Sequence, residues 1–236
     1  GKHPRVTVQL HRLPNGLRVV TEHMPGLRSA SVGVWITAGG RHERPEQNGI
    51  AHFLEHMAFK GTARRSALQI AEAIEDVGGY INAYTSRETT AYYARVLEGD
   101  VMLALDVIAD IVLNPVFDAA EIEVESGVIL QEIGQEHDTP DAVVFDWRQE
   151  AAYPDQAMGR TILGEADRGQ GFSQRDLFGF VRERYGPGQI IGAAAGAVDH
   201  DAIAREVERL FGHLEPASSS APDPARFVGG ERLEAK

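Results

Sequence analysis

The spacing of hydrophobic residues along this chain switches between two periods, which separate predicted strands from predicted helices. Residues 29–37 alternate, with apolar side chains at every second position, as expected for a strand with one buried face. Runs rich in β-branched and aromatic residues predict five more strands, at 6–10, 17–22, 80–85, 89–97 and 189–197. A Pro-Asn-Gly turn joins the first two strands into a hairpin.

Capping residues mark the ends of seven predicted helices. Ser66 with Gln69 forms a capping box, and Asp118 with Glu121 opens a long helix. Helices are expected at 48–61, 66–77, 100–113, 118–137, 141–152, 173–185 and 199–212, with a long glycine-rich loop at 153–172. Because strands and helices mix without regular alternation, we predict an α+β fold with a mixed, largely antiparallel sheet packed by helices.

Length and composition bound the domain organisation. The chain has 236 residues and 43% hydrophobic content, enough for one large domain or two small ones. Residues 216–226, with three prolines and a run of three serines, read as a linker after a first domain at 1–215. No stretch is long and apolar enough to span a bilayer, and no apolar signal core follows the N-terminus.

Charge and the absence of cysteine narrow the candidate chemistry. A net charge of −12 argues against binding to nucleic acid or anionic membranes. Without cysteine the chain forms no disulfide, and any metal site must use His, Asp or Glu. This shifts weight from a closed structural zinc site to a catalytic site with an open position.

The stretch from Asn48 to Gly61 carries the strongest chemical signal. Asn48 is expected to cap a helix of about three turns that ends at Lys60-Gly61. His52 and His56 are four residues apart, so both imidazoles leave the same helix face and can chelate one zinc ion. Glu55 lies on that face and is placed to take a proton from a metal-bound water.

Two histidines need a third protein ligand. The plainer interpretation is a pair of core or surface histidines beside a solvated glutamate, but the register of the whole motif disfavours it. The predicted helix at 118–137 offers Glu125 and Glu132, two turns apart on one face. Apolar Val128 and Ile129 suggest that this face is buried, and a metal would compensate buried carboxylates. Spacing alone leaves the choice between Glu125 and Glu132 open.

Three stretches together resemble one family. The zinc stretch at 52–62 resembles that of the pitrilysin-type (inverzincin, M16) metallopeptidases, whose signature is His-x-x-Glu-His. Residues 82–88 and 125–132 resemble two further hallmark stretches, and 192–198 resembles a later strand. The resemblance covers nearly the whole chain. It is nearest to the mitochondrial processing peptidase β-like and bacterial processing-peptidase-like subfamily.

The resemblance implies a fold, a metal and a set of roles. It implies a LuxS/processing-peptidase-like metallohydrolase domain that binds one zinc ion per chain. Glu132 would be the third ligand beside His52 and His56, Glu125 an outer carboxylate that orients the site, and Glu55 the general base. The implied activity is that of a zinc-dependent endopeptidase.

The resemblance also implies how substrate is held. An extended peptide, such as a presequence-like segment, would pair with the strand at 80–85, where Asn82 and Ala83 match substrate-binding positions. A plainer interpretation of Asn82 is a polar residue at the end of a strand. Relatives carry a second homologous domain that closes a chamber, and residues 227–236 resemble its start. A partner domain or subunit, a dimer in the intact enzyme and weak or absent activity of this half alone are therefore expected.

Two rival functions remain from the sequence. One is a non-catalytic structural or assembly subunit of the respiratory core-protein type, which resembles this family but commonly has damaged zinc motifs. The other is a zinc-binding module without catalysis. For the compartment, bacterial cytoplasm or periplasm is favoured, with the mitochondrial matrix as the alternative.

Overall fold

A computed structural model describes residues 7–165, 171–217 and 223–232. Its strands are β1 (Thr7–Arg12), β2 (Arg18–His23), β3 (Ser29–Ile36), β4 (Tyr80–Thr85), β5 (Thr90–Leu97) and β6 (Ile190–Gly196). Its helices are α1 (Ile50–Ala58), α2 (Ala67–Glu75), α3 (Val101–Leu113), α4 (Ala119–His137), α5 (Pro140–Ala152), α6 (Gln174–Arg184) and α7 (His200–Phe211). The predicted α+β class is confirmed.

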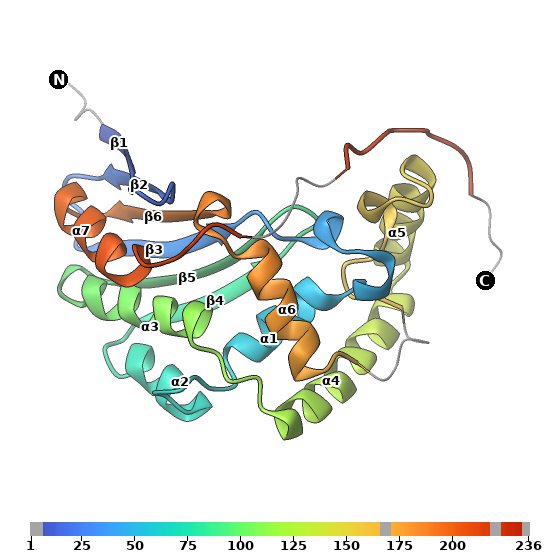
Figure 1. Ribbon diagram of the computed structural model, residues 1–236, viewed down its shortest axis with the longest axis horizontal. Coiled ribbons are helices and arrows are strands. Elements are labelled where there is room, and N and C mark those ends of the chain that lie inside the picture. Colours follow the sequence, from blue (N-terminus) through green and yellow to red (C-terminus); the bar gives the residue numbers. More distant parts are fainter. Residues whose placement is uncertain (1–6, 166–170, 218–222, 233–236) are drawn as a thin grey trace.

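One mixed sheet runs through the molecule in the order β1-β2-β6-β3-β5-β4 (Figure 1). Only β2 and β6 pair in parallel; the other four pairs among the described strands are antiparallel. The predicted β1–β2 hairpin is present, and β4 and β5 form a second antiparallel pair. The sheet is therefore largely antiparallel, as predicted, and β4 lies at one edge.

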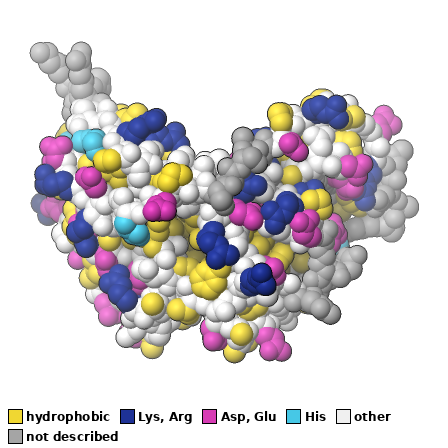
Figure 2. Space-filling view, viewed as in Figure 1, with side chains coloured by type: hydrophobic (Ala, Val, Ile, Leu, Met, Phe, Trp, Pro, Cys, Tyr) yellow, Lys and Arg dark blue, Asp and Glu magenta, His cyan; other side chains and the backbone are white. Residues whose placement is uncertain are grey.

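Helices cover one face of the sheet and form the core there. Helix α3 packs on β3 and β5, α7 on β2, and α1 and α2 on β4 (Figure 1). The side chains that β3 contributes to this core, at every second position as predicted, are fully buried: Ala30, Val32, Val34 and Ile36. On the opposite face, Trp35 is half-buried and Tyr84 is exposed. Figure 2 shows positive and negative side chains interspersed on one side of the molecule.

Three features differ from the sequence predictions. Asp100 occupies the N-cap position of α3, but its side chain makes no capping hydrogen bond. Val128 is exposed whereas Ile129 is buried, because only the Ile129 side of α4 faces the core. The loop at 153–172 contains a short 3₁₀ turn, Ala157–Gly159, and no other helix or strand in its described part.

Some sequence predictions reach residues outside the described ranges. These are Val6 at the start of the first strand, residues 166–170 of the loop, the serine run at 218–220 and the last four residues. The described segment 223–232 forms no helix or strand. It contacts the end of α5, where the Val228 N–H donates to the Ala152 carbonyl at 2.8 Å. No helix within the described residues is long and apolar enough to cross a membrane.

The turn after α1 is tied to α3 by one buried carboxylate. The Asp110 side chain is 0% exposed and accepts hydrogen bonds from Thr62 Oγ1 at 2.7 Å, Arg65 Nη1 at 2.9 Å and Asn114 Nδ2 at 2.9 Å. These bonds fix the segment that follows α1 against the core. Its partners come from three separate positions in the sequence, so a single substitution removes the acceptor of three donors, among them the buried Thr62 hydroxyl.

We expect Asp110→Ala to lower the free energy of unfolding by about 3–5 kcal/mol, the cost of breaking a buried charged network from one side. Urea unfolding followed by circular dichroism measures the change. Asp76→Ala, at the end of α2, is the control because the Asp76 side chain is exposed, and we expect a change within about 0.5 kcal/mol. Equal stabilities of the two variants would contradict the assigned network.

The start of α1 also differs from prediction. The N-cap is Gly49, with φ of +95°, and no side chain caps the helix from that position. The Asn48 side chain donates instead to the Thr161 carbonyl at 2.8 Å. A β-carbon on Gly49 would lie 2.7 Å from the Leu163 carbonyl oxygen, so the close approach of this loop requires glycine.

A buried glutamate supplies the missing cap. Glu43 Oε1 accepts from the Gly49 N–H at 3.1 Å, and Glu43 Oε2 accepts from the Ala51 N–H at 2.9 Å. Burial raises the pKa of Glu43 to about 7, although these bonds act in the opposite direction. A glutamate with a raised pKa keeps its proton in the folded state at pH values where the unfolded chain has lost it.

This pKa predicts a pH dependence of stability. Between pH 4.5, the ordinary value, and about 7, the folded state binds more protons, so the free energy of unfolding falls as pH rises. The contribution of Glu43 is about 3 kcal/mol over this window. Subtracting the urea-unfolding profile of Glu43→Gln from that of the wild type isolates it. We expect the difference to fall by that amount; parallel profiles would contradict the raised pKa.

Candidate metal centre

Three side chains from two helices converge on one point. His52 and His56 project from α1, one turn apart, and Glu132 projects from α4. One ligand atom from each lies within 4.8 Å of the others. The Nε2 atoms of the two histidines are 3.1 Å apart, and each lies 3.5 Å from a different oxygen of Glu132.

This donor set fits a zinc ion. Zinc bonds of 2.0–2.1 Å in a tetrahedron place neighbouring ligand atoms about 3.3 Å apart, and the observed separations of 3.1 and 3.5 Å straddle that value. Burial lowers the pKa of His52 to about 4, so its imidazole is neutral at pH 7. A neutral imidazole offers the lone pair that a metal needs.

A buried carboxylate orients the ring of His56. Glu125 Oε2 lies 3.0 Å from His56 Nδ1, and Lys60 Nζ lies 2.8 Å from Glu125 Oε1. Burial acts to raise the pKa of Glu125, but the hydrogen bonds of Lys60 and His56 hold it below its ordinary value. An ionised carboxylate only accepts, so His56 Nδ1 donates this hydrogen bond, and Nε2 is the ring nitrogen that faces Glu132.

Glu55 lies between the histidines in sequence and contacts the edge strand. Its Oε2 accepts a hydrogen bond from Thr85 Oγ1 at 2.7 Å. Burial raises the pKa of Glu55 above its ordinary value, while the Thr85 bond opposes this rise. A raised pKa brings a carboxylate closer to the range in which it can both accept and release a proton near neutral pH.

Strand β4 carries Asn82 and Ala83 beside this cluster. Because side chains alternate across a strand, Ala83 lies on the same face as Thr85, and Asn82 lies on the other face with Tyr80. The Asn82 side chain donates to Tyr80 Oη at 2.7 Å and accepts from the Ala83 N–H at 2.8 Å. As the edge strand of the sheet, β4 has one side without a neighbouring strand among the described residues.

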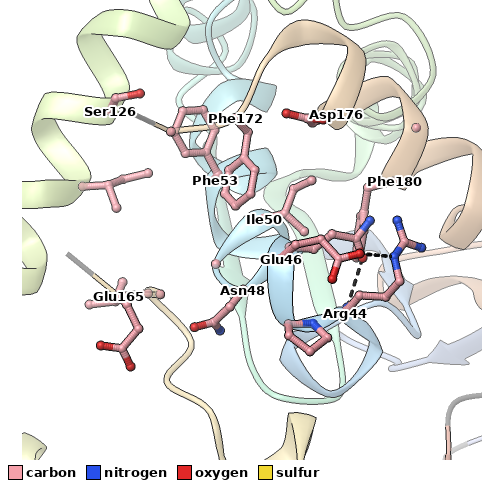
Figure 3. A pocket seen from close by; sticks show the side chains of 18 of the residues that line it. Arg44, Glu46, Asn48, Ile50, Phe53, Ser126, Glu165, Phe172, Asp176 and Phe180 are labelled. Carbon is pink, nitrogen blue, oxygen red and sulfur yellow. Dashed lines mark hydrogen bonds and ion pairs between the residues drawn. The ribbon is translucent and has the colours of Figure 1, made fainter. Parts of the chain in front are cut away.

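A large cavity lies elsewhere. Its volume is about 910 Å³, and none of the three converging side chains or Glu55 lines it. Phe53 lies next to Phe172 on one side of this cavity, with Arg44 and Glu46 across from them (Figure 3). Its walls come from α1 and the segment 44–49 before it, from α4, and from α6 and the loop before it. We assign the candidate chemistry to the converging cluster, because within the described residues it is the group of three side chains that could hold a metal ion.

Three residues that support the cluster do not follow from the sequence. The sequence predicts Lys60 only as the end of a helix and places Thr85 only in a hallmark stretch. Glu43 carries no local signal, because its contacts with α1 form between segments that the folded chain brings together. The lone lysine after the motif, one of three in the chain, was the one hint available for Lys60.

Residues 18–166 match the family model described as insulinase, peptidase family M16. The chain belongs to peptidase family M16. The match includes α1, α4 and every residue of the converging cluster.

Relatives come from plants and bacteria. A probable mitochondrial-processing peptidase β subunit from Arabidopsis thaliana is 46% identical over 93% of this chain and 42% of its own length. An uncharacterized zinc protease from Streptomyces coelicolor is 42% identical over 98% of this chain and 50% of its own. The chain thus spans about half the length of these curated relatives.

Solved structures share the fold. The crystal structure of a protease from Helicobacter pylori matches with a TM-score of 0.86 and 24% identity, over 94% of this chain and 54% of that one. An inactive M16 peptidase domain from Pseudomonas fluorescens matches with a TM-score of 0.83 and 18% identity, over 91% and 52%. At these identities the likeness concerns the fold alone.

Proposed function

We propose that this chain is the zinc-binding half of a metalloendopeptidase. The observation that carries the proposal is the convergence of His52, His56 and Glu132 within 4.8 Å, with Glu55 on the same helix. In this proposal the three residues would hold one zinc ion. When bound, zinc would lower the pKa of a water molecule and polarise the scissile carbonyl.

Protein side chains then accept the proton of the attacking water and return it to the leaving group. Glu55 accepts the proton of the attacking water on the oxygen that Thr85 does not bond. It returns that proton to the amide nitrogen as the C–N bond breaks, so that the peptide yields a carboxylate and an amine. Thr85 keeps the Glu55 carboxylate turned towards β4. Glu125 keeps the His56 ring in its orientation.

The substrate in this proposal is a peptide in extended form. The edge position of β4 supports addition of a peptide as a further strand, held by main-chain hydrogen bonds. Asn82 and Ala83 would contact it; the Asn82 oxygen, which bonds the Ala83 N–H, would turn away if the peptide pairs there. A presequence-like basic peptide also suits the net charge of −12.

The proposal includes a second half. Relatives are about twice as long as this chain, so we propose domain 1–215, linker 216–226 and, from 227, the start of a second homologous domain. A second domain or partner subunit would close a chamber over β4, and the intact enzyme would be dimeric. We propose a bacterial cytoplasmic or periplasmic location, or the mitochondrial matrix, following the origins of the relatives.

The converged cluster argues against the two rival functions. A structural subunit has no need of two histidines and a glutamate in metal-binding geometry beside a glutamate with a raised pKa. A zinc module without catalysis would not need Glu55. Glu55→Gln separates these cases, since it leaves the ligand set intact.

We expect Glu125→Gln to weaken zinc binding about 10- to 100-fold, as loss of a carboxylate behind a metal-bound histidine typically does. Competition with a fluorescent zinc chelator measures the affinity. Glu123→Gln, which is exposed on the same helix, is the matched control and should bind zinc like the wild type. Unchanged affinity in Glu125→Gln would show that the His56 contact has no part in metal binding.

The activity itself is tested in a protein that carries both proposed domains. A quenched fluorescent peptide is incubated with the metal-free protein, and zinc is then titrated in. We expect cleavage to appear with zinc and to disappear with chelator. A zinc-loaded protein that cleaves no peptide in a library of basic and apolar sequences would contradict the proposed function.

A further inference from the structure

Helix α1 holds its two histidines by different means. His56 lies in the second half of the helix, and its ring is fixed by Glu125 through Nδ1. His52 is the third residue of the helix, and its buried Nδ1 has no hydrogen-bond partner within the described residues. The orientation of the His52 imidazole therefore depends on the backbone of the first turn.

That first turn depends on Glu43. The N-cap glycine offers no side chain, and the two oxygens of Glu43 bond the N–H groups of Gly49 and Ala51 at 3.1 and 2.9 Å. The amide of Ala51 directly precedes His52. A helix end with unsatisfied N–H groups frays, and fraying here would move His52 before any other part of the cluster.

Glu43 is in turn fixed on its other side. Arg160 Nη2 donates to the Glu43 carbonyl oxygen at 2.6 Å, and the Asn48 side chain joins the same loop at Thr161. Glu43 is 3% exposed, so water does not compete for its carboxylate. The loop at 153–172, which the sequence predicts only as a glycine-rich connection, thus holds Glu43 in place at the start of α1.

We propose that Glu43 is a positioning residue of the metal centre, which fixes His52 by capping α1 from outside the helix. This inference rests on the proposed zinc site. Glu43 touches no ligand atom; it acts on the metal only through the backbone between Gly49 and His52. Removal of the Glu43 carboxylate should therefore weaken zinc binding and, at the same time, disorder the first turn of α1.

The test uses this chain with zinc alone and has two readouts. The first is the zinc dissociation constant, measured by chelator competition. The second is hydrogen–deuterium exchange of the α1 amides in the metal-free chain. For Glu43→Ala we expect zinc binding weaker by about tenfold or more, in the range of indirect effects on metal ligands. We also expect faster exchange at Ala51 and His52, with exchange in α7 unchanged.

The matched control removes a helix cap far from the metal. Asp199 Oδ2 accepts from the Ala202 N–H at 2.9 Å at the start of α7. Asp199→Ala should destabilise the fold like any lost cap and leave zinc affinity unchanged. Wild-type affinity in Glu43→Ala, or an equal loss in Asp199→Ala, would overturn the proposal.

Glu43→Gln keeps the test decisive if Glu43→Ala does not fold. It keeps one acceptor oxygen for α1, so it should remain folded by circular dichroism and weaken zinc binding less than Glu43→Ala. A folded Glu43→Gln with unchanged affinity and unchanged Ala51 exchange would overturn the proposal. A wild-type chain that binds no zinc would instead contradict the proposed function, while the exchange readout would still decide whether Glu43 caps α1.

Discussion

Glu55→Gln is expected to retain about one zinc per chain and to lose cleavage by a factor of about 10²–10⁴, the usual contribution of a general acid–base group. The amide cannot accept the proton of water, but it has the same shape and can still accept the hydrogen bond from Thr85 Oγ1. The loss should appear in kcat, because Glu55 is not among the three converging ligand atoms. Peptide cleavage by the protein with both proposed domains, and zinc content of the same sample, are the measurements.

Glu72→Gln is the control for this substitution. Glu72 is exposed on α2, so its variant should cleave like the wild type and bind the same amount of zinc. If Glu55→Gln kept full cleavage, the role of Glu55 would pass to another group. If it lost zinc as well, the effect on cleavage would no longer report proton transfer.

Glu132→Ala is the second substitution with a large expected effect. One oxygen of Glu132 lies 3.5 Å from His52 Nε2 and the other lies 3.5 Å from His56 Nε2. Without Glu132 only two protein ligands remain. We expect zinc affinity to fall by at least about 10³-fold, since a stable site in proteins requires three or four ligands. Chelator competition measures the affinity, and cleavage should be lost together with the metal.

The control for Glu132→Ala lies on the same helix. Gln135→Ala removes an exposed side chain less than one turn away on α4, and it should leave zinc affinity unchanged. Comparable binding in Glu132→Ala and the wild type would remove Glu132 from the ligand set. Glu125, the alternative that spacing left open, would then be the residue to test.

Local patterns in the sequence were enough to predict most elements of the fold. The capping box of Ser66 with Gln69 formed as expected, because both of its partners lie within four residues. Alternation predicted β3 and its buried face. The register of His52 and His56 followed from helix geometry alone, since a four-residue spacing fixes the shared face.

Local patterns do not predict the contacts between segments that are far apart in the sequence. Asn48 is a good cap by type, yet Gly49 takes that position because the loop at Leu163 approaches too closely for a side chain. The choice between Glu125 and Glu132 needed the placement of α4 against α1: Glu125 reaches Nδ1 of His56 and Glu132 reaches Nε2. The spacing of residues along a helix predicts which side chains share a face. It does not predict where along its length that helix contacts another helix.

The zinc content of this chain tests the central claim most directly. The chain is stripped with chelator, incubated with zinc, dialysed and measured by atomic absorption, with His52→Ala treated in parallel. The account predicts about one zinc per wild-type chain and much less in the variant. A folded wild-type chain without zinc, or equal zinc in the variant, would contradict the assignment of His52, His56 and Glu132 as a metal site.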